Sequence, residues 1–147
     1  MLQKSDILAE VRNILKTKIQ KLEELVASTR AANNETKSSM GDKYETSREM
    51  VQQEINRLLS QLSEAQNQLQ SIQRLSTDES LEVKHGALFR TEKGFFYVSA
   101  ALGEIVVNGQ KLYAVSPESP LVKALLGKKV RESGGFGNQM FTIEEIW

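Results

Sequence analysis

The sequence predicts an α+β protein: an N-terminal antiparallel α-helical coiled-coil hairpin, followed by a C-terminal antiparallel β domain with a short helix. Of the nine glycines only Gly41 precedes residue 76, whereas both prolines and eight of the nine aromatic residues follow it. Up to residue 72, apolar residues recur at alternating spacings of three and four, as in coiled-coil helices. We therefore expect two modules, residues 1–76 and 81–147, joined by a linker at 76–80.

Charge and composition exclude several classes of protein. Up to residue 76 the chain has 11 Lys and Arg against 10 Asp and Glu, and beyond it 8 against 9. These balances weigh against attraction of either whole module to nucleic acid or an anionic membrane, and leave only local patches open. The lack of cysteine excludes disulfides and thiolate sites, and the single histidine, His85, cannot form a histidine metal cluster. Because no apolar run resembles a signal peptide or a membrane span, we expect a soluble cytoplasmic protein.

Two long helices are expected on either side of Gly41. The apolar positions of the first are Leu8, Val11, Leu15, Leu22 and Leu25, with a neighbouring row of Leu15, Ile19, Leu22 and Val26. Those of the second are Val51, Ile55, Leu58, Leu62, Ala65, Leu69 and Ile72. Neither helix can bury its stripe alone, so we expect an antiparallel hairpin roughly 40 Å long. One uninterrupted helix that dimerises in parallel is the alternative, but the stripe fades between Asn33 and Gly41, where the chain can turn.

The segment Gly-Asp-Lys-Tyr-Glu, residues 41–45, falls at this reversal and holds two carboxylates, Asp42 and Glu45. On a helix this spacing places them on one face, and it also suits a capping box; spacing alone favours capping over a functional role. The pair would hold Mg²⁺ poorly without further ligands, because this ion takes six oxygens. Tyr44, between them, either packs on the first helix or contacts a partner or a base, with packing slightly favoured.

The C-terminal module has strand signals at residues 87–91, 94–101, 104–107, 110–115 and 139–146. Asn108 and Gly109 predict a two-residue hairpin turn, and the glycine-rich residues 134–137 predict a flexible turn before the last strand. The candidate core residues are Phe89, Phe95, Tyr97, Tyr113, Phe141 and Trp147.

A short helix is expected over residues 121–126, where it would cover one face of the sheet. Ser119 is a good N-cap, Pro120 suits the first helical position, and Gly127 closes the helix. The basic run that follows, residues 128–131, is a candidate contact for nucleic acid or a polymerase, although a solvated loop is the favoured interpretation.

With both modules placed, the chain resembles the Gre family of bacterial transcript cleavage factors, GreA and GreB, over nearly its whole length. The family's tip pattern Gly-Asp-x-x-Glu matches Gly41, Asp42 and Glu45. Its signature Ser-Pro-x-x-x-Ala-Leu-x-Gly-Lys, the more specific of the two, matches Ser119, Pro120, Ala124, Leu125, Gly127 and Lys128.

The resemblance implies a protein that binds RNA polymerase and inserts its coiled-coil tip into the secondary channel, with an FKBP-like C-terminal domain at the channel rim. It implies that Asp42 and Glu45 help the polymerase active centre to hold a second Mg²⁺ and a water, so that the polymerase cleaves its own backtracked transcript. Tyr44 and the signature residues are assigned to partner binding, which includes the transcript 3′ end. The chain would be a monomer without a cofactor of its own, and would not be an enzyme in isolation.

Departures from the family pattern leave the activity class open. Where the family often has Asn-Ala-Glu-Tyr after the second acid, this chain has Thr-Ser-Arg-Glu at residues 46–49, and its aromatic, Tyr44, precedes that acid. A secondary-channel regulator or inhibitor without cleavage activity is therefore the alternative. A third candidate is a peptidyl-prolyl isomerase or peptide-binding module on a coiled-coil spacer, which rests on shape alone, and fold does not establish activity.

Overall fold

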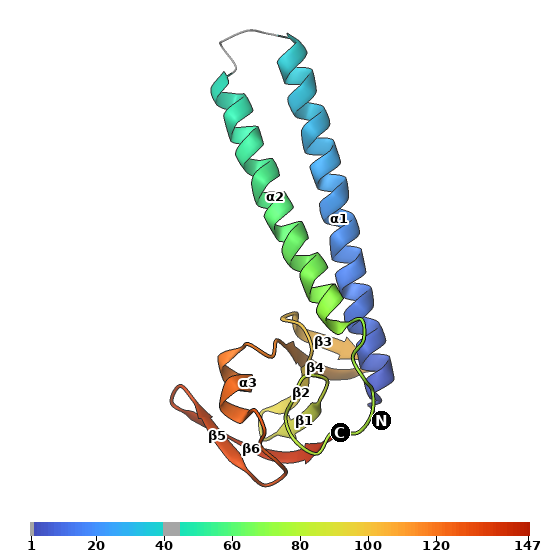
Figure 1. The fold of residues 1–147 in the computed structure, drawn as a ribbon, viewed down its shortest axis with the longest axis vertical. Helices are drawn as coiled ribbons and strands as arrows, with labels where there is room; N and C mark the ends of the chain where they lie inside the picture. Colours follow the sequence, from blue (N-terminus) through green and yellow to red (C-terminus); the bar gives the residue numbers. More distant parts are fainter. Residues whose placement is uncertain (1, 40–44) are drawn as a thin grey trace. The chain divides into compact units, whose positions relative to one another are not determined.

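The computed structural model describes residues 2–39 and 45–147, and the side chains of residues 2–33 and 47–147. The chain separates into two compact units: one comprises the residues up to Asn13 and from Gln70 onward, and the other comprises residues 14–69. The elements in chain order are α1 (Lys4–Ser39), α2 (Glu45–Ile72), β1 (Leu88–Thr91), β2 (Gly94–Val98), β3 (Gly103–Val107), β4 (Gln110–Val115), α3 (Pro120–Leu125), β5 (Ser133–Phe136) and β6 (Gln139–Ile146) (Figure 1). Two long helices followed by a sheet with a short helix confirm the predicted α+β class.

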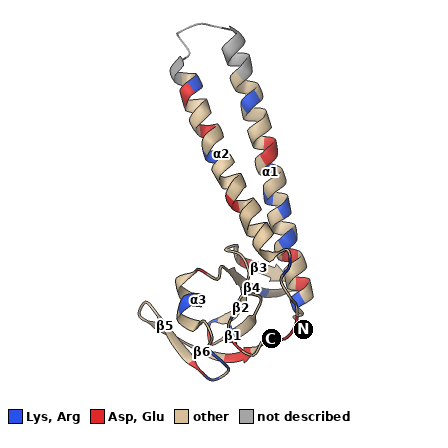
Figure 2. Ribbon diagram, in the orientation of Figure 1, with Lys and Arg blue, Asp and Glu red and all other residues tan. Residues whose placement is uncertain are grey.

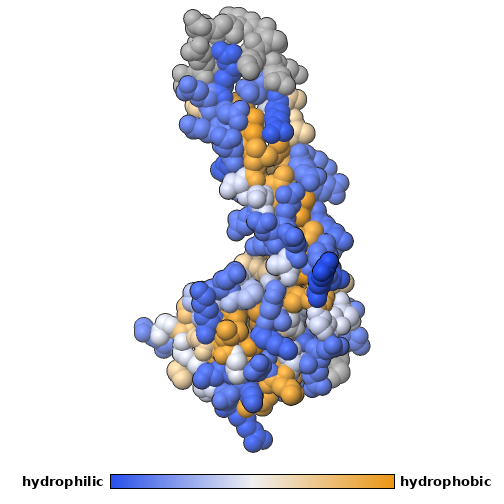
Figure 3. Space-filling view, viewed as in Figure 1, coloured by the Kyte–Doolittle hydropathy of each residue, from blue (hydrophilic) through white to orange (hydrophobic). Residues whose placement is uncertain are grey.

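The second unit is a hairpin of two antiparallel helices, the later part of α1 and most of α2 (Figure 1). Its seam consists of the buried residues Leu22, Val26, Leu58 and Ala65, with Ile19, Leu59 and Leu62 packed against them. Apolar side chains accordingly follow the hairpin in Figure 3. Of the two rows expected on the first helix, the seam contains the one that ends at Val26. Val26 is 5% exposed, whereas Leu25, which ends the other row, is 50% exposed.

The first helix is longer than the sequence indicated. It continues to Ser39, through most of the stretch between Asn33 and Gly41 in which the apolar pattern fades. The residues between them include no proline or glycine, and the modest helix penalty of Asn, Ser and Thr does not end a helix that is already formed. None of the helices within the described residues has both the length and the apolar character needed to cross a membrane.

The six strands form one sheet in the order β3-β4-β2-β1-β6-β5. Four neighbouring pairs are antiparallel, but β2 and β4 are parallel, which corrects the purely antiparallel sheet expected from the sequence. The short link between β2 and β3 crosses the end of β4, where the Leu102 amide donates to the Ala114 carbonyl. The hairpin turn predicted between β3 and β4 is confirmed, with positive φ angles at Asn108 and Gly109.

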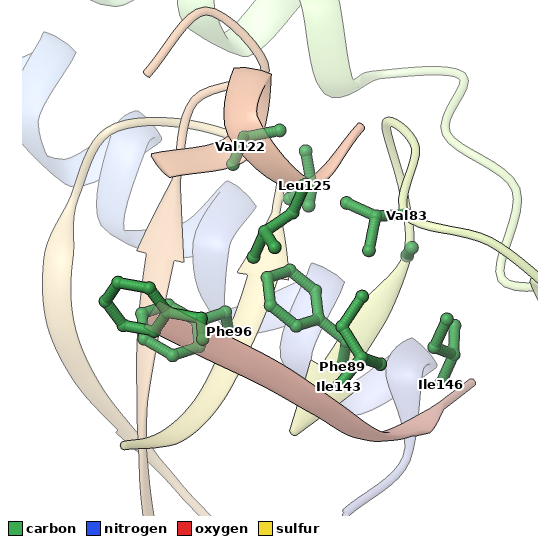
Figure 4. Close-up of a cluster of buried hydrophobic side chains, with 10 residues drawn as sticks. Val83, Phe89, Phe96, Val122, Leu125, Ile143 and Ile146 are labelled. Carbon is green, nitrogen blue, oxygen red and sulfur yellow. The ribbon is translucent and has the colours of Figure 1, made fainter. Parts of the chain in front are cut away.

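Side chains alternate across the sheet, and both of its faces are buried. The face beneath α3 holds the core drawn in Figure 4, which comprises Val83, Ala87, Phe89, Phe96, Val98, Val122, Leu125, Phe141, Ile143 and Ile146. On the opposite face Leu88, Tyr97 and Leu112 are at most 1% exposed. Within the same unit, Ile7, Leu8 and Val11 of α1 are buried. The sequence pattern predicted Phe95 and Tyr97 as core residues, on the assumption that one face of this strand is buried. Because both faces are buried, Phe96 between them is also a core residue.

A further correction concerns the glycine-rich segment before β6. It was expected to be a flexible turn at 134–137, but residues 133–136 form strand β5, and β5 pairs with β6 from Ser133↔Thr142 to Phe136↔Gln139. The turn is confined to residues 137 and 138, where Gly137 has a φ of +62°. Gly134 is buried, so it serves close packing rather than flexibility.

Candidate functional site

The predicted tip residues fall where two long helices meet: Asp42 and Tyr44 lie between them, and Glu45 is the first residue of the second. α1 ends at Ser39 and α2 begins at Glu45, so the segment that holds Asp42 and Tyr44 joins them. Asp42 and Tyr44 lie outside the described residues, as does the side chain of Glu45. Their roles as cap, metal-assisting or partner-binding residues therefore stay predictions. α2 has 28 residues, which corresponds to roughly 42 Å of helix at ~1.5 Å per residue.

The two tip carboxylates are of the ligand type that Mg²⁺ prefers, but they are too few to form a complete site. Carboxylate oxygens are ligands that Mg²⁺ prefers, whereas an octahedral site needs six of them. Asp42 and Glu45 could therefore hold the ion only together with water and ligands from a partner. Across the described residues, no group of three or more His, Asp or Glu side chains could hold a metal ion.

Both helices of the hairpin carry cations (Figure 2), and Arg48 on α2 forms no ion pair with a described side chain. Lys16, Lys18 and Lys21 are exposed, and none of them forms an ion pair with a described side chain. On α2, Arg57 Nε donates to Glu54 Oε2 at 2.9 Å, and this hydrogen bond holds the pKa of Glu54 below its ordinary value.

The signature segment folds as a capped helix. The Ser119 hydroxyl accepts a hydrogen bond from the Val122 amide at 3.3 Å, and Pro120 opens α3, as the sequence predicted. Gly127 has a φ of +78°, which lets the chain turn sharply after the helix. Its amide donates to the Val83 carbonyl at 2.8 Å, while the Val83 amide donates to the Lys128 carbonyl at 2.9 Å. These two bonds tie the end of the segment to the irregular stretch before β1.

The signature residues lie on one short segment in different surroundings. Pro120 and Gly127 are exposed, and Ser119, Ala124 and Lys128 are half-buried. Leu125 is fully buried in the core beneath α3 (Figure 4). Its side chain therefore holds α3 on the sheet, whereas the other signature residues are exposed or half-buried.

Two exposed apolar side chains beside the signature went unrecognised in the sequence. Leu126 is 56% exposed and Val130 is 43% exposed. Leu126 directly follows the last buried residue of α3 and directly precedes Gly127, so its position at the helix end was the available signal. No sequence pattern marked Val130, because its exposure follows from the turn that holds it.

No protein-family model and no curated protein matches the chain. The crystal structure of GreA factor homolog 1 (Gfh1) of Thermus thermophilus is 20% identical to it, covers 92% of this chain and 94% of that chain, and gives a TM-score of 0.38. A structure of the transcription factor Gfh1 is 21% identical, covers 92% of each chain, and gives a TM-score of 0.37. Both belong to a GreA-like factor, but at these values the likeness does not establish a function, which has to rest on the chain's own residues.

Proposed function

We propose that this chain is a Gre-type transcription elongation factor that binds RNA polymerase and places its hairpin tip in the secondary channel. The observation that carries the proposal is the position of residues 41–45. The Gly-Asp-x-x-Glu pattern falls at the junction of two long antiparallel helices that share an apolar seam. A narrow arm of this kind can carry two carboxylates into a site that a globular surface cannot enter.

The arm contributes position and charge, and the polymerase carries out the hydrolysis. Leu22, Val26 and Leu58 in the seam keep the two helices together, so the tip is presented on a stiff support. Asp42 and Glu45 would hold Mg²⁺ jointly with ligands of the polymerase, and in that position the ion would activate a water. The chain by itself is not an enzyme in this proposal.

The signature segment supports the same assignment from the other module. Capping by Ser119 and burial of Leu125 fix α3 on the sheet, and this leaves Pro120, Gly127 and Lys128 on an ordered surface. We assign this surface to docking at the rim of the channel. Ordered backbone lowers the entropy lost on binding, which favours a stable contact.

A second candidate is a regulator that occupies the channel without stimulating cleavage. It is favoured by one specific observation: Tyr44 precedes the second acid, so the tip aromatic is displaced from the family's position. In that case Asp42 and Glu45 would act mainly as helix-capping residues.

Backtracked elongation complexes distinguish the two candidates. The proposal predicts that wild-type protein releases short 3′ RNA fragments, and that Asp42→Asn and Glu45→Gln abolish this release without weakening polymerase binding. Glu49→Gln is the matched control, because it removes an exposed carboxylate one helical turn further along α2.

Each outcome assigns the function differently. Binding without fragment release by the wild type would establish the channel regulator. Full stimulation by both tip variants would refute the metal-assisting role, and absence of polymerase binding would refute the assignment as a whole.

A further inference from the structure

The basic run after α3 forms a strained turn. The Glu132 amide donates to the Lys129 carbonyl at 3.0 Å, which closes a four-residue turn over residues 129–132. Its third residue, Arg131, has a φ of +77°, whereas Val130 is not among the residues with positive φ. This is the pattern of a type II turn, whose third position favours glycine because a side chain is strained there.

The turn is firmly anchored, so this strain is imposed by the surrounding structure. The Arg131 amide donates to the Ile143 carbonyl at 2.7 Å, which fixes the turn to β6. The Glu132 carboxylate accepts a hydrogen bond of 2.6 Å from the Lys129 amide. Glycine at position 131 would adopt this backbone without strain, so a merely solvated loop gains nothing from an arginine here.

The segment around this arginine is rich in cations. Between Ser119 and Gln139 the chain has four of them, Lys123, Lys128, Lys129 and Arg131, and one acid, Glu132. Lys123, Lys129 and Arg131 are exposed, and none of the four forms an ion pair with a described side chain. The Glu132 carboxylate, the acid within this segment, is engaged by a backbone amide of the turn. This segment therefore carries a local excess of positive charge in a chain whose formal net charge is +0.

We propose that Lys123, Lys128, Lys129 and Arg131 form a contact surface for the phosphate backbone of duplex DNA. Arginine binds phosphate oxygens in a bidentate manner, and lysines nearby add point charges. A duplex presents one negative charge per about 1.7 Å of axis, twice the density of a single strand, so it suits a cluster confined to one short segment. The contact is independent of the tip acids, and it remains testable if the assignment to polymerase fails.

Fluorescence anisotropy with a short labelled DNA duplex tests this on the full chain. If all four cations contact phosphates, the logarithm of the binding constant should fall with the logarithm of salt concentration with a slope of about −3 to −4. Arg131→Gly should weaken binding several-fold and make the slope shallower by about one unit. The same variant should melt at an equal or higher temperature, because it relieves the positive φ. Arg131→Asn, which also tolerates this backbone, provides a second uncharged variant.

Two control variants separate position from charge. Arg131→Lys should keep the salt slope, and Arg74→Ala, which removes an exposed cation outside the cluster, should leave binding nearly unchanged. The proposal is overturned if the duplex does not bind at low salt, or if Arg131→Gly and Arg131→Asn lose no more affinity than Arg74→Ala. It is equally overturned if single-stranded RNA binds more tightly than the duplex, or if the variants weaken polymerase binding but not DNA binding.

Discussion

A Cβ atom placed on Gly134 would lie 2.6 Å from the carbonyl oxygen of Ala124 and 2.7 Å from Leu125 Cδ2. Strand β5 therefore approaches the backbone of α3 more closely than any side chain permits. This contact explains how a segment with two adjacent glycines forms an ordered strand. It also explains how α3, with only 6 residues, is held on the sheet from two sides.

Replacing Gly134 by alanine should destabilise the C-terminal module by about 1–3 kcal/mol, because the added methyl group displaces the helix backbone. Urea denaturation measures the loss. Gly135→Ala is the matched control, since its Cβ would meet the flexible Met140 side chain at 3.2 Å. Equal losses for the two variants would contradict the close approach.

Removing the cap of α3 should also reduce stability. Ser119→Ala leaves the Val122 amide without its partner and should cost about 1 kcal/mol, whereas Ser119→Asp should retain most of the stability. Thermal unfolding followed by circular dichroism compares the variants. An alanine variant as stable as the aspartate variant would show that the cap contributes nothing to this helix.

The seam of the hairpin can be tested with two leucines. Leu58 is 4% exposed, and Leu58→Ala should destabilise the helical hairpin by about 2–5 kcal/mol through a lost side chain and a cavity. Leu25→Ala should change stability by no more than about 0.5 kcal/mol, because Leu25 is half exposed. Helical circular dichroism during urea unfolding reports both. A larger loss of stability for Leu25→Ala would show that Leu25 is part of the seam.

Tyr97 should make stability fall at alkaline pH. Burial raises the pKa of Tyr97 to about 12, with the nearby positive charge of Arg12 acting in the opposite direction. An unfolded tyrosine loses its proton near pH 10. Between these values the unfolded state binds fewer protons than the folded state, so the free energy of unfolding decreases as pH rises through this window, by roughly 2 kcal/mol in total.

Tyr97→Phe isolates this effect. The Tyr97 hydroxyl has no hydrogen-bond partner among the described groups, so the variant should be about as stable as the wild type at neutral pH. Urea unfolding from about pH 8 to 11 should then show less loss for the variant than for the wild type. Parallel curves for the two proteins would show that Tyr97 titrates normally.

Local patterns predicted much of this fold. Heptad spacing indicated the paired helices, Asn108 and Gly109 fixed the β3–β4 turn, and Ser119 with Pro120 located α3, because each depends on neighbouring residues. The parallel pairing of β2 with β4 could not be predicted, since it is decided by where a hairpin docks on a distant strand. The strand at Gly134 was missed for a similar reason: its glycines are selected by contact with α3 and not by local flexibility.

For the candidate site, the sequence indicated the position of the tip acids between two helices, and the structure agrees. The signature residues lie in one short stretch of the sequence, and their assignment to partner binding stays a prediction. The sequence could not separate their roles, because burial of Leu125 depends on strands that are remote in the chain. The sequence could not predict the positive φ at Arg131 either, because that turn is anchored by a hydrogen bond to β6.

Strand β1 lies between β2 and β6, and Leu88 and Trp147 exchange backbone hydrogen bonds of 2.7 and 3.3 Å. On a translating ribosome, the helical hairpin can form as soon as α2 has emerged, because its contacts join two helices that are adjacent in the chain. Strands β1 to β4 can pair with one another earlier, but the sheet is completed only when residues 139–146 supply β6. Until then the edge of β1 that later pairs with β6 is open. A pause late in synthesis would therefore leave a nascent chain whose helical hairpin has folded and whose sheet is incomplete, and the open strand edge would be prone to aggregation.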